Sequence, residues 1–113
     1  MTHVTVYTYH DKFLSVEISG HTGYSESGSD IICAAISSLT QGILLGLKKV
    51  VGLNIEEIVD DEKGYLSFRL PDVMNKEQAE KAYCLTDTLV EALKDLVSGY
   101  PDFIEMEEVK NVY

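Results

Sequence analysis

Apolar and polar residues alternate in two short runs near the start of the chain, at 4–9 and 14–19. In the second run Leu14, Val16 and Ile18 take the apolar positions. A period of two residues is typical of β-strands with one buried face. The polar link at 10–12 is short enough for a hairpin, so the two runs predict a pair of antiparallel strands.

Helical spacing of apolar residues follows from 31 to about 51, with Asp30 as the predicted N-cap and Gly52 as the stop. A second helix is predicted over 76–98, between a cap at Asn75 and a stop at Gly99. The apolar positions are Ile32, Ile36, Leu39, Ile43, Leu47 and Val50 in the first helix, and Leu85, Leu89, Leu93 and Leu96 in the second. The first helix is so apolar that we expect it to pack on a sheet and also against a further surface, such as a second subunit.

Three more strands are predicted, at 55–59, 65–70 and 103–109, and the polar turn at 60–64 joins the first two of these as a hairpin. The order is then two strands, helix, two strands, helix, strand. A chain of 113 residues has room for one domain. We therefore expect an α+β fold: a single-domain two-layer sandwich, in which a mixed sheet carries both helices on one face.

The chain is strongly acidic, with 19 Asp plus Glu against 9 Lys plus Arg and a formal net charge of −10. Such a surface repels nucleic-acid phosphates and attracts basic proteins, so we expect no direct nucleic-acid binding. The N-terminus has no recognisable targeting segment, which makes the cytoplasm the expected location. The uncharged stretch 31–47 is interrupted by polar residues and is expected to be too short and too polar to span a membrane.

Candidate chemistry gathers in the Gly- and Ser-rich segment 19–29 and at the start of the first predicted helix, where His21, Asp30 and Cys33 occur close together. With Asp30 as N-cap, Cys33 falls in the first turn, where unpaired N–H groups and the positive helix end favour a thiolate. His21 would serve as base or as imidazolium partner. Ser37, four residues after Cys33, shares its helix face.

Plainer readings of these residues stay open. Cysteine is often buried, aspartate is a routine N-cap and glycine-rich loops often only connect elements. A metal site is disfavoured because structural zinc normally takes four ligands, and no phosphate-loop pattern is present, so we expect neither metal nor cofactor. Cys84 falls off the leucine stripe of the second helix, beside acidic residues, and is expected to be a surface or interface residue without a catalytic role.

The segments Gly20-His21-Thr22-Gly23 and Asp30-Ile31-Ile32-Cys33-Ala34-Ala35-Ile36-Ser37 resemble the signature of the ribosomal-processing cysteine proteases, the Prp family. The resemblance spans the chain and implies one cysteine protease domain over 1–113. It implies a homodimer that removes the N-terminal extension of large-subunit ribosomal protein number twenty-seven, a basic substrate that suits an acidic enzyme. The roles implied are catalytic for His21 and Cys33, supporting for Asp30 and Ser37, and substrate-loop for Gly20, Thr22, Gly23 and Gly28.

One position departs from the family pattern, because Thr22 stands where alanine is usual, which bears on substrate preference more than on activity. The mechanism implied is acyl transfer through a Cys33 thioester, with N–H groups at the helix start holding the oxyanion. Asp30 either caps the helix or orients His21, and the glycine loop is expected to close over a bound peptide. Two other functions remain open: a non-catalytic acidic dimeric module that binds a basic ribosomal protein, and a thiol-dependent enzyme acting on a small molecule.

Overall fold

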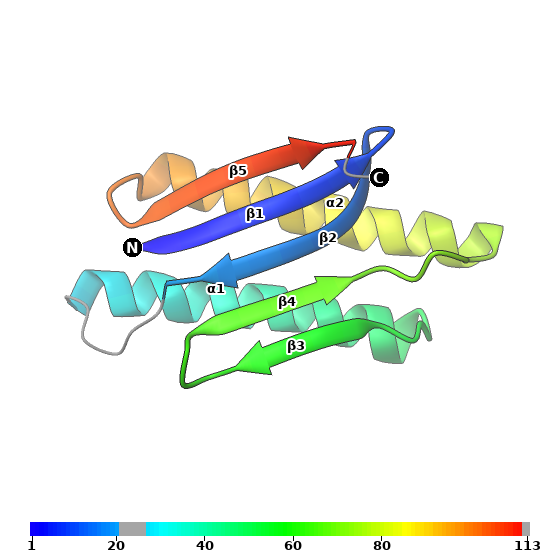
Figure 1. The fold of residues 1–113 in the computed structure, drawn as a ribbon, viewed down its shortest axis with the longest axis horizontal. Coiled ribbons are helices and arrows are strands. Elements are labelled where there is room, and N and C mark those ends of the chain that lie inside the picture. The colour runs from blue at the N-terminus through cyan, green and yellow to red at the C-terminus, as the bar shows by residue number, and fades with distance from the viewer. Residues whose placement is uncertain (21–26, 112–113) are drawn as a thin grey trace.

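The computed structural model describes residues 1–20 and 27–111, with 27–30 as helical backbone only. The elements are β1 (Thr2–Tyr9), β2 (Lys12–Ser19), α1 (Ser27–Leu45), a π-helical turn η1 (Gly46–Val50), β3 (Glu56–Asp60), β4 (Tyr65–Arg69), α2 (Lys76–Gly99) and β5 (Ile104–Lys110) (Figure 1). The predicted order of strands and helices is confirmed. Each predicted strand agrees with the observed one to within about two residues.

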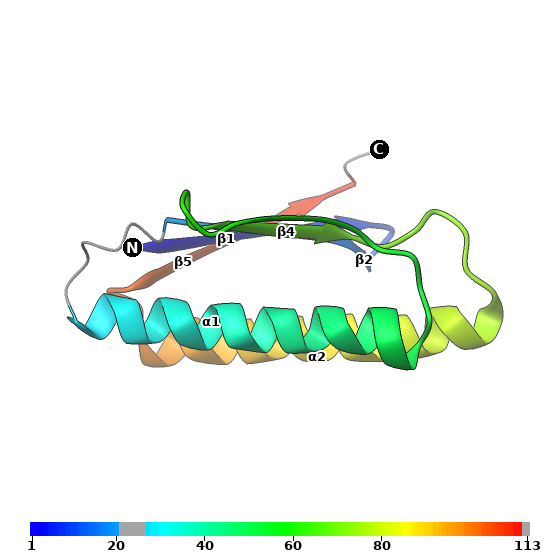
Figure 2. The same ribbon diagram turned by 90° about the horizontal axis from the view of Figure 1, so that it is seen from below.

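One five-stranded sheet, in the order β3-β4-β2-β1-β5, forms the first layer of the fold. β1 and β5 are parallel, whereas the other neighbouring strands are antiparallel. Both helices lie against the same face of the sheet, and no described element covers the opposite face, which we call the uncovered face (Figure 2). The predicted two-layer arrangement with a mixed sheet is therefore confirmed.

The β1–β2 hairpin turns through His10 and Asp11, whose positive φ angles of 51° and 64° are those of a type I′ turn. Beyond the turn, the pairing passes from Tyr7–Ser15 to Thr8–Phe13 and leaves Leu14 as the extra residue of a β-bulge. The bulge reverses the alternation, so Phe13 is buried in the core while Leu14 is only half-buried. Leu14 was therefore wrongly predicted as a core position.

The core lies between the sheet and the two helices. The buried apolar residues of the helices in this core are Ile32, Ile36, Leu44 and Leu47 from α1 and η1, and Ala82, Leu89 and Leu93 from α2. Val50, expected on the apolar stripe of the first helix, is instead 79% exposed. The i→i+5 bond from the Val51 N–H to the Gly46 carbonyl widens the last turn, and this shifts the following side chains away from the 3.6-residue period.

Of the two predicted helix starts, one is confirmed and the other is wrong. Asn75 caps α2 as predicted, and its side chain forms a reciprocal capping box with Gln78. In contrast, α1 begins at Ser27, so Asp30 lies inside its first turn and is not the N-cap. The extra residues 27–29 carry no apolar side chain, so hydrophobic periodicity contains no signal for them.

The helical stretch Ile31–Val50 is 20 residues long and has a mean hydropathy of 1.6. By length and composition alone, this helix could cross a membrane. The expectation that this part of the chain is too short and too polar to do so is therefore not supported. In the fold, the same stretch supplies Ile36, Leu44 and Leu47 to the core. Its apolar character thus has a structural use inside the domain.

Candidate active site

Cys33 lies in the second turn of α1, six residues after Ser27. The residue is buried, with 5% of its surface exposed to solvent. The prediction that it occupies the first turn is wrong because the helix starts earlier. In a regular helix the N–H of Cys33 bonds to the carbonyl four residues before it. The unpaired N–H groups of a helix belong to its first turn, which here comes before Cys33.

Cys33 borders a small cavity of about 60 Å³ between α1 and the β3–β4 hairpin. From α1, Cys33, Ser37 and Gln41 face it at intervals of four residues, which is one side of the helix. The other lining residues are Ile18, Val59, Asp61, Gly64, Tyr65 and Leu66. The structure thus brings Ser37 to the same cavity as Cys33, as the shared helix face predicted.

The hairpin contribution to this cavity was not predictable from local pattern. Asp61 belongs to an acidic run that predicts a solvated turn, and the residue is indeed exposed. It nevertheless borders the Cys33 cavity. Only the pairing of β2 with β4 brings the hairpin end beside α1. Cys84, by contrast, is exposed on α2, as expected.

Gly20 directly follows β2 and has a conformation that favours glycine, with φ at +108°. A Cβ added there would lie 2.2 Å from the carbonyl oxygen of Met1. The residue two positions earlier, Ile18, already lines the Cys33 cavity. The chain therefore leaves the sheet close to this cavity, one residue before His21.

The structure describes only some of the remaining predicted site residues. Asp30 and Gly28 belong to the first turn of α1, so Gly28 is a helical residue and not part of the loop. His21, Thr22 and Gly23 lie outside the described residues, as does most of the predicted substrate loop. Within residues 1–20 and 31–111, no group of three His, Cys, Asp or Glu side chains is placed to hold a metal ion.

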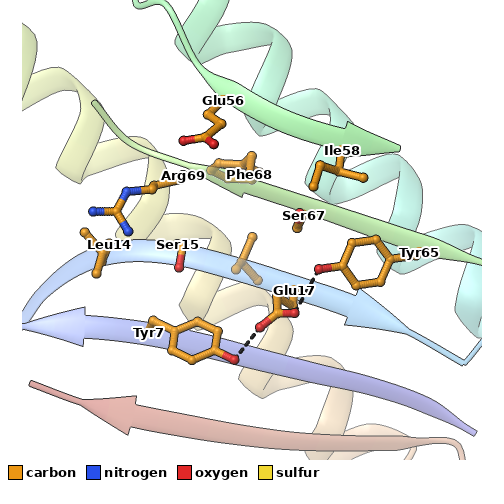
Figure 3. A pocket seen from close by; sticks show the side chains of 11 residues that line it. Tyr7, Leu14, Ser15, Glu17, Glu56, Ile58, Tyr65, Ser67, Phe68 and Arg69 are labelled. Carbon is orange, nitrogen blue, oxygen red and sulfur yellow. Dashed lines mark hydrogen bonds between the residues drawn. The ribbon is translucent and has the colours of Figure 1, made fainter. Parts of the chain in front are cut away.

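A second, larger cavity of about 290 Å³ opens on the uncovered face of the sheet (Figure 3). We call it the Glu17 hollow; its lining includes Tyr7, Ser15, Glu17, Tyr65, Ser67 and Arg69. Glu17 accepts hydrogen bonds from the hydroxyl of Tyr7 at one carboxylate oxygen and from that of Tyr65, at 2.8 Å, at the other. Alternating polar residues on strands normally indicate only a solvated face, so the sequence contained no signal for this site.

These contacts shift the acidity of both phenols. The hydrogen bond to the Glu17 carboxylate, together with burial and the nearby negative charge, raises the pKa of Tyr7. A hydrogen bond with Ser67 lowers the pKa of Tyr65, but burial and the bond to Glu17 raise it overall. Both tyrosines therefore stay protonated at neutral pH and act as hydrogen-bond donors to Glu17.

Comparison with known proteins shows what the chain as a whole is similar to. The family model described as Cysteine protease Prp matches residues 1–105. The ribosomal processing cysteine protease Prp of Bacillus subtilis (strain 168) is 27% identical over 103 residues, covering 90% of this chain and 92% of that protein. The crystal structure of SMU.848 from Streptococcus mutans superposes with a TM-score of 0.87 at 27% identity, over 97% of this chain and 95% of that one.

A further crystal structure shows the same fold at lower identity. The ribosomal processing protease Prp from S. aureus, in complex with a substrate peptide, has a TM-score of 0.83 at 23% identity. The similarity covers 96% of this chain and 99% of that one.

Proposed function

The chain belongs to the family of Prp cysteine proteases, and on that premise we propose that it is an endopeptidase with Cys33 as nucleophile and His21 as general base and acid. The observation that carries the proposal is the position of the thiols. The chain has two cysteines, of which Cys33 borders a cavity and Cys84 lies exposed on α2. A protease nucleophile has to meet its substrate at such a concave site.

In the proposed reaction, the Cys33 thiolate attacks the scissile carbonyl, and His21 gives a proton to the departing amine as the tetrahedral intermediate collapses to a thioester. Water, activated by His21, then attacks the thioester. The peptide fragment leaves as a carboxylic acid, and the Cys33 thiol is restored. Both steps pass through an oxyanion that needs hydrogen-bond donors.

Ser37 is our candidate for one of these donors. Side chains of a helix lean toward its N-terminus, so the Ser37 hydroxyl extends toward the turn that holds Cys33. Both residues line the same cavity. For Asp30, the helix start at Ser27 removes the capping role, which favours the alternative that it orients His21.

As substrate, we propose the N-terminal extension of large-subunit ribosomal protein number twenty-seven, cleaved in the cytoplasm. The name of the Bacillus subtilis relative supports a ribosomal substrate. The net charge of −10 supports a basic one, because opposite charge speeds encounter and favours binding. As lined by the described residues, the Cys33 cavity measures about 60 Å³, below the roughly 300–1,000 Å³ of sites that enclose a small molecule, whereas a peptide needs to place only its scissile bond there.

The test is incubation of the purified protein, and separately of Cys33→Ser, with a peptide that spans the extension, read by mass spectrometry. We expect the wild type to cut one bond and Cys33→Ser to leave the peptide intact. Cys84→Ser is the matched control and should cut like the wild type. An intact peptide with the wild type, while the peptide still binds, would support the non-catalytic acidic module instead.

We also propose that the protein is a homodimer that uses the outer side of α1. That side exposes Ile31 and Leu45, at 68% and 56%, in line with the small residues Ala35, Ser38 and Gly42. Small residues let two helices approach closely, and apolar residues at both ends give the contact its hydrophobic area.

Light scattering tests the dimer. We expect twice the chain mass of 12.6 kDa for the wild type and the single mass for Gly42→Lys. No atom lies within 4 Å of a Cβ at Gly42 or at Gly99, so each monomer accommodates the added side chain. Gly99→Lys, on α2, should remain dimeric; a dimer that persists in Gly42→Lys would place the interface elsewhere.

A further inference from the structure

The Glu17 hollow is a consequence of strand register on the uncovered face of the sheet. Ser15 pairs with Tyr7 on one side and Arg69 on the other, and Ser67 pairs with Glu17 and Ile58. Two short serine side chains thus lie among long neighbours near the middle of the sheet. The long side chains form the walls of the cavity of about 290 Å³, as Figure 3 shows.

In the lining of this hollow, the half-buried Glu17 carboxyl group lies between two phenols. Each of its oxygens accepts one tyrosine hydroxyl, which leaves further lone pairs on the carboxylate. None of the ion pairs between described residues involves Glu17. The Glu17 side chain can therefore accept a further hydrogen bond from a cationic group that enters the hollow.

The lining of the hollow is negative overall, with two carboxylates against one guanidinium. Glu56 adds a second carboxylate. The guanidinium of Arg69, the cation of the lining, also contacts the Asp72 carboxylate at 3.3 Å. The walls contain the aromatic rings of Tyr7 and Tyr65, whose faces attract cations.

We propose that the Glu17 hollow receives a lysine or arginine side chain of the basic peptide substrate. The cationic head would donate to Glu17 and to the two tyrosine oxygens, while its methylene stem lies against the rings. This inference rests on the proposed function for the identity of the ligand. Tyr65 lines both the hollow and the Cys33 cavity, so the two sites lie on either side of one strand end and one peptide can contact both.

The first experiment measures binding alone. Hexalysine is titrated into isotope-labelled Cys33→Ser protein, and amide shifts are followed by NMR. We expect shifts at Tyr7, Ser15, Glu17 and Tyr65, and an affinity about tenfold lower in Glu17→Gln, because one charge-assisted bond is lost. Glu80→Gln is the matched control, since it removes the same charge from an exposed position on α2. Equal weakening by both variants, or none by either, would overturn the proposal.

The second experiment measures cleavage of two peptides, the extension itself and a copy with norleucine in place of every lysine and arginine. Glu17→Gln should raise KM about tenfold for the basic peptide, leave kcat unchanged, and leave the norleucine peptide unaffected. Tyr65→Phe should show the same selectivity more weakly. If Glu17→Gln slowed both peptides equally, the hollow would have a structural role only.

The two experiments separate this inference from the proposed function. If the wild type cleaves neither peptide, the proposed protease substrate is wrong, yet hexalysine binding still decides whether the hollow takes a cation. If the extension is cleaved and hexalysine does not contact the hollow, the substrate assignment stands and the inference fails.

Discussion

Gly20 and Met1 approach each other so closely that no side chain fits between them. A Cβ on residue 20 would lie 2.2 Å from the Met1 carbonyl oxygen, well inside van der Waals contact. The φ angle of +108° is a second reason for glycine at this position. The end of β2 is therefore packed against the start of β1, directly before His21.

Replacing Gly20 by alanine should destabilise the fold by about 3 kcal/mol, because the methyl group forces both a clash and a strained φ. It should also lower peptide cleavage by displacing the chain that leads to His21. Urea unfolding measures the first effect and initial rates the second. Gly99→Ala, with open space around the added Cβ, should leave both unchanged. A Gly20→Ala protein of normal stability would show that the contact with Met1 relaxes freely.

Leu89 is fully buried in the centre of the helix–sheet interface, at 0% exposure. Leu89→Ala should cost about 2–5 kcal/mol of unfolding free energy, because it loses apolar burial and leaves a cavity. Val73→Ala, at a position 86% exposed, should change stability by less than about 0.5 kcal/mol. Comparable losses for the two variants, measured by the urea midpoint at constant m, would contradict this placement of the core.

The capping box of α2 predicts a smaller and more specific effect. Asn75→Ala removes the acceptor for the Gln78 N–H, 2.8 Å away, and should cost about 1 kcal/mol. Asn75→Asp keeps an acceptor and should retain most of the stability. Thermal unfolding followed by circular dichroism distinguishes them; identical midpoints for Asn75→Ala and the wild type would mean that water replaces the cap.

The raised pKa of Tyr7 predicts a change at alkaline pH. A group whose folded pKa lies above its unfolded value, here the ordinary tyrosine pKa of 10.0, stabilises the fold below that value. This contribution is lost as pH rises through the folded pKa, because the unfolded chain releases its proton first. The stability difference between wild type and Tyr7→Phe should therefore fall above about pH 10.

A titration of tyrosinate absorbance checks the cause of that shift. The signal lost in Tyr7→Phe should belong to a tyrosine that ionises late in the wild type. In Glu17→Gln the same tyrosine should ionise earlier, since the main cause of its raised pKa is the bond to the carboxylate. An unchanged titration in Glu17→Gln would show that burial governs the shift.

Local sequence patterns were sufficient for the order of elements. Alternation identified the strands, the 3.6-residue period identified both helices, and Asn75 marked the start of α2, because each signal depends on neighbours along the chain. The family, too, was evident from the residues around His21 and Cys33. Where a local signal was missing, as at residues 27–29, or altered, as at the Leu14 bulge, the prediction failed.

The sequence by itself therefore determined the order of strands and helices, the two-layer architecture and the cysteine protease family. The tertiary structure alone decided what surrounds the chemistry: Asp61 and Tyr65 beside Cys33, and Glu17 between Tyr7 and Tyr65. Those neighbours are far apart along the chain and meet through strand register and the packing of α1 on the sheet. Contacts of this kind depend on the whole fold at once, which no local period encodes.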